Sequence, residues 1–122
     1  MTFRLRSKIW LENEAGKPIV GEGRLRIFYT IRRTGSILKA AQTLGLPYRN
    51  VWAKIKDAEE QCGFKIVETS SRGSRLTIQG EQLLRAYDEL QRSCKRSAGA
   101  KFRKLFSRND RSRADTEEED FL

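Results

Sequence analysis

The stretch RTGSILKAAQTLGLPYRNVWAKI, residues 33–55, places two short helical patterns on either side of a Gly-Leu-Pro turn. In the first pattern we expect Ser36 to cap the helix, because its hydroxyl can accept an unpaired backbone N–H. Gly45 suits the left-handed conformation that ends many helices. The predicted inward face of this helix is formed by Ile37, Ala40, Ala41 and Leu44. These spacings predict two helices joined by a sharp turn.

The second pattern predicts a helix from about Pro47 to Cys62, because the fixed φ of proline suits a first helical turn. Glu59 and Glu60 near its end read as solvated charges. The predicted inward stripe comprises Val51, Trp52, Ile55 and Ala58. Polar, basic and small residues are left on the outward face.

The flanking segments extend these two helices into a larger unit. A preceding helix is expected to end at Thr34–Gly35, and its apolar residues Leu25, Ile27, Phe28 and Ile31 share one face. After the second helix, residues 65–69 and 75–77 read as two strands around a Ser-Ser-Arg-Gly-Ser loop. A helix, a tight turn, a helix and a strand pair predict a winged helix-turn-helix, with its wing at 64–76. The fold class is α+β, mainly α.

The N-terminal segment alternates apolar and polar residues from Phe3 to Glu12, which predicts a half-buried strand. Asn13–Gly16 supplies turn residues, and Lys17–Val20 reads as a short return strand. We therefore expect an N-terminal β-hairpin over residues 3–20.

A long helix over residues 77–94 is predicted after the wing, with Thr77 as its cap. Its apolar face needs a partner, either the hairpin or another subunit, and in the second case it is a dimerisation helix. From Lys95 to Arg113 there are eight Lys or Arg against one Asp, and five acids follow between 115 and 120. The expected organisation is one domain over residues 1–94 and a charged, weakly ordered tail over 95–122.

The composition favours a polyanionic partner. The formal charge is +9, from 25 Lys and Arg against 16 Asp and Glu, and residues 23–76 hold eleven basic and four acidic residues of that total. Nucleic acid is the first choice and an anionic membrane surface the second. Because the sequence lacks a long apolar run and a signal peptide, we expect a cytoplasmic chain with no membrane partner.

The sequence gives little support for catalysis. It contains no His, and its lone glycine-rich stretch is Gly21–Gly23. Cys62 and Cys94 are too few for a zinc site or a disulfide framework, and they read as reduced thiols. We expect no enzyme, no metal and no cofactor.

The outward positions of the 47–62 helix suit recognition of DNA bases, because the N-terminal part of such a helix meets base edges in the major groove. Arg49 suits a guanine edge and Asn50 an adenine edge, whereas Ala53 leaves room for a thymine methyl. Two Arg near the wing tip suit a minor groove or phosphate. The candidate DNA-binding residues are Lys39, Tyr48, Arg49, Asn50, Ala53, Lys54, Lys56, Arg72 and Arg75.

The order of these motifs resembles the N-terminal domain of ModE-type molybdate-responsive transcriptional regulators over roughly residues 8–94. The resemblance is carried by Gly21–Arg24, Arg33–Ile37, Ala40–Ala41, Tyr48–Arg49 with Trp52, and Leu76–Thr77 before Gly80. It implies a winged helix-turn-helix that dimerises and binds a palindromic operator.

Three features depart from that family's pattern. No molybdate-binding domain follows in this chain, the wing loop SSRGS is short, and Pro47 replaces the small hydroxyl residue that usually opens the recognition helix. A LysR-type module is similar across residues 25–77, but that family lacks the leading hairpin. The effector, if there is one, stays open.

Two other functions remain compatible with the sequence. A protein-interaction adaptor would use the same scaffold, with the acidic C-terminal residues and the long helix as docking surfaces. A non-specific nucleic-acid binder would instead rely on the basic tail.

Overall fold

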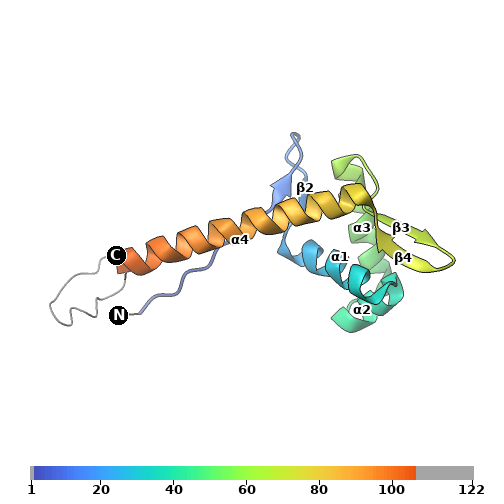
Figure 1. Cartoon of the computed structure of the whole chain (residues 1–122), viewed down its shortest axis with the longest axis horizontal. Helices are drawn as coiled ribbons and strands as arrows, with labels where there is room; N and C mark the ends of the chain where they lie inside the picture. The colour runs from blue at the N-terminus through green and yellow to red at the C-terminus, as the bar shows by residue number, and fades with distance from the viewer. Residues whose placement is uncertain (1, 107–122) are drawn as a thin grey trace. The chain divides into compact units, whose positions relative to one another are not determined.

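Three consecutive helices lie between residues 22 and 62 and supply much of the core. The computed structural model describes residues 2–106. Helices α1 (Glu22–Thr34), α2 (Ile37–Leu44) and α3 (Tyr48–Cys62) pack against one another, and α1 also packs against strand β4 (Gly73–Leu76) (Figure 1). The winged helix-turn-helix predicted from the sequence is confirmed.

The turns between the helices use the residues that the sequence marked. The Ser36 Oγ accepts a hydrogen bond from the Lys39 N–H at 3.0 Å, which caps α2. At the end of α2, Gly45 has a φ of 68°, in the left-handed region that glycine adopts without strain. The Leu46 N–H then donates to the Ala41 oxygen at 2.9 Å and directs the chain toward α3.

Strands β3 (Val67–Ser70) and β4 form the wing as an antiparallel hairpin. Ser70 pairs with Gly73, so the turn comprises residues 71 and 72 and is tighter than the predicted five-residue loop. Gly73 has a φ of 118° and also lies against the end of α1, where an added Cβ would stand 2.5 Å from the Gly35 oxygen. The Ser74 N–H donates to that same oxygen at 2.9 Å.

The prediction of a long N-terminal strand is wrong for residues 3–10. Strand β1 comprises Leu11–Glu12 alone and pairs with β2 (Pro18–Val20), with Leu11 opposite Val20. The next residue after Val20 is the cap of α1, so the partner strand ends where the helix starts and cannot pair with residues 3–10. Phe3 and Leu5 are accordingly exposed.

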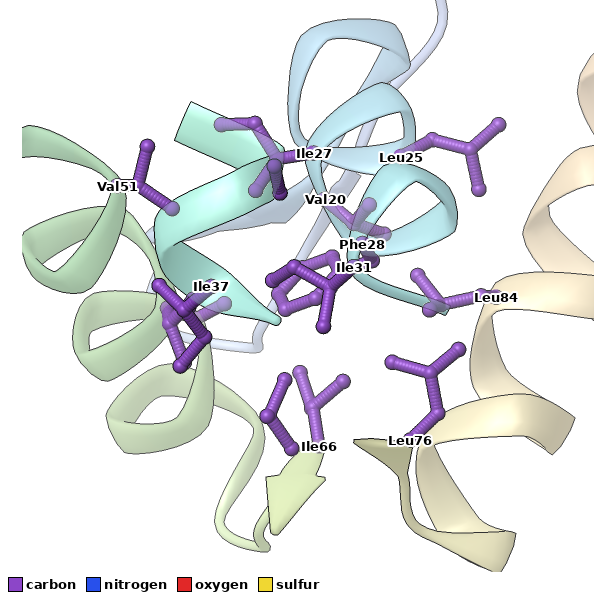
Figure 2. Close-up of a cluster of buried hydrophobic side chains, with 14 of the residues drawn as sticks. Val20, Leu25, Ile27, Phe28, Ile31, Ile37, Val51, Ile66, Leu76 and Leu84 are labelled. Carbon is purple, nitrogen blue, oxygen red and sulfur yellow. The ribbon is translucent and has the colours of Figure 1, made fainter. Parts of the chain in front are cut away.

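The core of residues 8–89 is closed by α1, α3, the segment before β3 and the start of α4 (Ile78–Phe106) (Figure 2). The side chains of Phe28, Ile31, Ile66 and Leu84 are 1% exposed or less. Figure 2 shows them directed toward one another, together with Leu76 at the end of the wing. Trp52, predicted to be core, is only partly buried at the edge of this cluster.

Helix α4 (Ile78–Phe106) continues well past the predicted end at residue 94. Residues 95–106 are rich in Lys, Arg and Ala, which are good helix formers, and Phe102 and Phe106 are spaced one turn apart. The described residues divide into two compact units, residues 8–89 and residues 2–7 with 90–106. Within the second unit the Phe106 ring lies 5.6 Å from that of Phe3. Residues 107–122 of the predicted tail lie outside the described residues.

The start of α4 crosses the segment before the wing very closely. The Thr77 hydroxyl donates to the Lys65 oxygen at 2.7 Å and accepts from the Gly80 N–H at 2.9 Å, which confirms the predicted cap. The Thr77 N–H donates to the Ile66 oxygen at 2.9 Å. A Cβ on Gly80 would lie 2.6 Å from that oxygen, so only glycine allows this crossing.

We expect Gly80→Ala to lower the free energy of unfolding by roughly 1–3 kcal/mol, because the added methyl forces the helix and the Ile66 backbone apart. Chemical denaturation followed by circular dichroism would measure it. Gly23→Ala is the matched control, since a Cβ there meets no atom within 4 Å. Equal stability of the two variants would contradict the proposed steric role of Gly80.

Candidate nucleic-acid interface

The outward face of α3 lies opposite its buried stripe. Val51, Ile55 and Ala58 are at most 1% exposed. Arg49, Ala53 and Lys56 recur at helical spacing on the opposite side, and all three are exposed. This side of α3 therefore presents a cation at each end and a small residue between them, which allows another molecule to approach the helix closely.

The remaining predicted residues of α3 lie on its two flanks. Asn50 and Lys54 follow one flank, where Lys54 borders a pocket formed with the start of α1. Tyr48 lies on the other flank, where its ring meets Trp52 edge-on at 6.3 Å between centroids. The six α3 residues predicted to bind DNA thus surround three sides of the helix and do not form a single patch.

Lys56 is oriented by two neighbours. Its Nζ lies 5.3 Å from the centre of the Trp52 ring and 3.9 Å from the Glu59 carboxylate. A cation over an indole face gains a modest electrostatic attraction. Lys56 is therefore directed toward the flank of α3 that carries Trp52, whereas Lys54 is directed toward the other.

The wing presents two arginines, of which one is ion-paired and the other is not. The Arg75 Nε donates to the Glu68 Oε2 at 2.9 Å, across the hairpin, and the Arg75 side chain is 81% exposed. Arg72 lies in the turn and is exposed, and none of the ion pairs within residues 2–106 involves it. Among the wing residues, Arg72 thus offers the less compensated positive charge. On α2, Lys39 is also exposed.

Glu59 anchors the wing to α3, which corrects its interpretation as a solvated charge. Its Oε2 accepts the N–H groups of Ile66 at 2.9 Å and Val67 at 3.1 Å, and its side chain is only 11% exposed. These bonds satisfy two donors at the start of β3 that the hairpin leaves unpaired. The sequence could have indicated that Glu59 faces inward, because it follows the buried Ile55 by four residues, about one helical turn.

A second contact joins α3 to α1. The Arg24 guanidinium lies 2.8 Å from the Asp57 carboxylate and also donates to the Ile19 oxygen at 3.2 Å. The hydrogen bond from Arg24, followed by one from Gln61, holds the pKa of the Asp57 carboxyl below its usual range. Neither Arg24 nor Asp57 was a predicted site residue, and no local sequence pattern pairs them.

Three further properties of the described residues concern metal ligands, helix apolarity and the two cysteines. Groups of three or more potential metal ligands are absent from residues 2–106. Over the same range, no helix has the length and apolarity to cross a bilayer. Burial raises the pKa of the Cys62 thiol, and both cysteines are free.

Comparison with known proteins adds the family context. Residues 23–81 match the sequence model of the bacterial regulatory helix-turn-helix proteins of the LysR family, which covers α1, α2, α3, the wing and the start of α4. Residues 23–81 are therefore similar to the winged helix-turn-helix of LysR-family regulators. The LysR resemblance, which ranked second on the sequence, is thus better supported for this segment than the ModE resemblance.

Two curated relatives match parts of this chain. The HTH-type transcriptional regulator YofA of Bacillus subtilis is 40% identical over 68 residues, which are 56% of this chain and 24% of that protein. The molybdenum-pterin-binding protein MopA of Rhodobacter capsulatus is 29% identical over 90 residues, 70% of this chain and 34% of MopA. The chain therefore spans between about a quarter and a third of these two relatives.

A solved structure shares the fold. The DNA-binding domain of CbnR, in complex with DNA, superimposes with a TM-score of 0.55 and 23% identity over 65% of this chain and 91% of that domain. The likeness shows that the two domains share one fold.

We expect Glu59→Gln to destabilise the fold by roughly 1–3 kcal/mol, because an amide replaces a buried carboxylate that accepts two backbone N–H groups. Thermal unfolding in parallel with Glu60→Gln, an exposed neighbour, would separate this effect from the loss of one acidic charge. Equal melting temperatures of the two variants would contradict the anchor.

The Arg24–Asp57 contact predicts a pH-dependent contribution to stability. Because the folded-state pKa of Asp57 is lowered, its contribution is present above the unfolded-state pKa of about 4 and is lost as pH falls through the folded-state pKa. We expect Asp57→Asn to be less stable than the unsubstituted protein at pH 7, and we expect this difference to shrink as the pH is lowered below about 4. Urea unfolding at pH 7 and at pH values below about 4 tests this, and a difference independent of pH would contradict it.

Proposed function

We propose that this chain is the DNA-binding part of a transcriptional regulator, with double-stranded DNA as its partner. The observation that carries the proposal is the exposed Arg49–Ala53–Lys56 face of α3, which stands beside a wing with an uncompensated Arg72. A helix of this type fits the major groove, and the wing residues fit the adjacent backbone or minor groove. The solved CbnR relative is itself a complex with DNA.

The proposed roles of the site residues differ with their positions. Arg49, Asn50 and Ala53 read base edges, because they lie in the first turns of α3. The proposed phosphate contacts come from Lys39, Tyr48, Lys54, Lys56, Arg72 and Arg75. Ion pairing to Glu68 makes Arg75 a weaker contributor than Arg72, since binding DNA must first compete with that carboxylate.

A homodimer on a palindromic operator is the proposed assembly. Two-fold symmetry in the protein matches two-fold symmetry in the site. Within the second compact unit, the apolar side chains of Leu90 and Leu105 on α4 are 48% and 44% exposed, and a partner copy would cover them.

A finer assignment to ModE-like regulators rests on two observations. The resemblance stated from the sequence includes the hairpin before α1, which the LysR-family match does not reach. The molybdenum-pterin-binding relative also aligns with a larger share of this chain than YofA does.

We expect Arg49→Ala to weaken binding to the preferred site by roughly 5- to 150-fold, the range for one bidentate base contact, with little change on random duplex. Arg72→Ala should weaken binding to the preferred site and to random duplex equally. It should also reduce the slope of the logarithm of the binding constant against the logarithm of the salt concentration by about 1. The site is first selected from genomic fragments, and fluorescence anisotropy at two salt concentrations then measures both variants.

Lys17→Ala serves as the charge control, because Lys17 lies in the turn of the N-terminal hairpin. Equal losses for Arg49→Ala on both duplexes would contradict base readout by α3. Salt-dependent binding with no preferred site would assign the affinity to basic residues outside the helix-turn-helix, such as those at 95–104.

We expect the full chain to sediment as a dimer, and Leu90→Asp with Leu105→Asp to shift it toward the monomer, because charges replace the apolar contact. Analytical ultracentrifugation over a concentration series measures this. Substituting Arg92 and Arg103 with Asp on the same helix gives the matched control. A monomer at all concentrations would contradict the proposed assembly.

A further inference from the structure

A pocket of about 540 Å³ lies between the N-terminal segment, the start of α1, the end of α2 and α3. This volume lies within the range of roughly 300–1,000 Å³ typical of small-molecule sites. The pocket belongs entirely to residues 8–89, and it is separate from the Arg49–Ala53–Lys56 face of α3. Of the residues proposed above to contact DNA, Lys54 alone lines this pocket.

The walls of the pocket are mainly apolar. Val20 and Ile27, which belong to the core, lie at the pocket with exposed fractions of 1% and 4%, and Figure 2 shows both among the core side chains. Leu44 and Leu46 line it from the α2–α3 turn. Trp10 lines it from the N-terminal segment and is 50% exposed, so part of a large aromatic side chain remains open to a ligand.

Hydrogen bonds hold the N-terminal wall in place. The Tyr87 hydroxyl donates to the Ile9 oxygen at 2.7 Å, and the Trp10 Nε1–H donates to the Glu12 carboxylate at 2.8 Å. The Trp10 backbone approaches α1 at Gly21, where an added Cβ would lie 3.2 Å from the Trp10 Cβ. These contacts tie the N-terminal wall to α1 and α4, and a wall held in this way limits the ordering entropy lost when a ligand binds.

The charged groups at the pocket favour an anion. Lys8, Arg26 and Lys54 line it, and among the ion pairs within residues 2–106 none involves these three side chains. Arg24 also lines it but is engaged by Asp57, and Glu22 is the one acidic lining residue. Three available cations around apolar walls complement a molecule that carries both an apolar body and a negative group.

We propose that this pocket binds a small aromatic carboxylate, with its ring against Trp10 and the leucines and its carboxylate near Lys54, Lys8 or Arg26. An inorganic oxyanion fits less well, because it would leave the apolar walls uncovered. Bound ligand would contact both the α2–α3 turn and Lys54 of α3, and so connect a small molecule to the proposed DNA-binding helix. The binding itself does not depend on the proposed DNA function.

The test uses the full chain with Trp52→Phe, so that fluorescence reports Trp10 alone. The probe is 2-naphthoate, with the uncharged 2-naphthamide and inorganic phosphate as comparison ligands, and calorimetry supplies a second readout. We expect saturable binding of naphthoate at least about 10-fold tighter than of naphthamide, a difference of about 1.4 kcal/mol, with no binding of phosphate. Equal binding of the acid and the amide, or displacement of naphthoate by phosphate, would overturn the proposed chemistry.

Two variants locate the binding. Lys54→Gln should weaken naphthoate roughly 3- to 10-fold by removing one charge-assisted contact, whereas Lys39→Gln, a matched charge loss outside the pocket, should not. Gly23→Phe should abolish binding with the fold intact, because Gly23 lines the pocket and a Cβ there meets no atom within 4 Å. Saturable binding that survives Gly23→Phe, or absence of binding up to about 10 mM, would overturn the assignment. The assay contains no DNA, so it distinguishes failure of this site from failure of the proposed regulator function.

Discussion

The backbone around Ile66 is the constraint on which the arrangement of wing and recognition helix depends. Its N–H is held by the Glu59 carboxylate of α3, and its oxygen receives the Thr77 N–H at the start of α4. Because Gly80 has no side chain, the segment before β3 can pass directly against α4. One fully buried residue therefore joins α3, the wing and α4, and the geometry of the wing relative to α3 follows from these short contacts.

The wing also contacts the helix-turn-helix through its second strand, β4. The oxygen of Gly35, in the turn between α1 and α2, accepts the Ser74 N–H of β4, and Gly73 permits this approach. The Arg24–Asp57 contact similarly fixes α1 against α3. The scaffold is thus secured by polar contacts at its edges and by apolar packing at its centre, so the exposed faces of α3 and the wing can vary in sequence with little effect on the core.

The sequence predicted the elements whose signals are local. The Ser36 and Thr77 caps, the left-handed glycines and the inward faces of α1–α3 all depend on neighbours within one or two turns, and the structure has them. The prediction from sequence was wrong where residues far along the chain determine the structure. Residues 3–10 alternate like a strand, but they have no partner strand, because β2 ends at Val20 where α1 begins. The end of α4 was misplaced because a basic composition was equated with weak order. Glu59 was interpreted as solvated, and the contact between Asp57 and Arg24 was missed, because their partners are set by tertiary packing.

The turn at the tip of the wing differs from the strands in its contacts with the rest of the unit. Gly73, Ser74 and Leu76 contact the rest of the unit, whereas residues 71 and 72 are exposed. Loop-closure entropy grows slowly with length, by about 0.6 kcal/mol for each doubling. The turn is therefore a place where insertions can accumulate at small thermodynamic cost, and the reach of the wing can diverge among related chains while the frame that carries it stays the same.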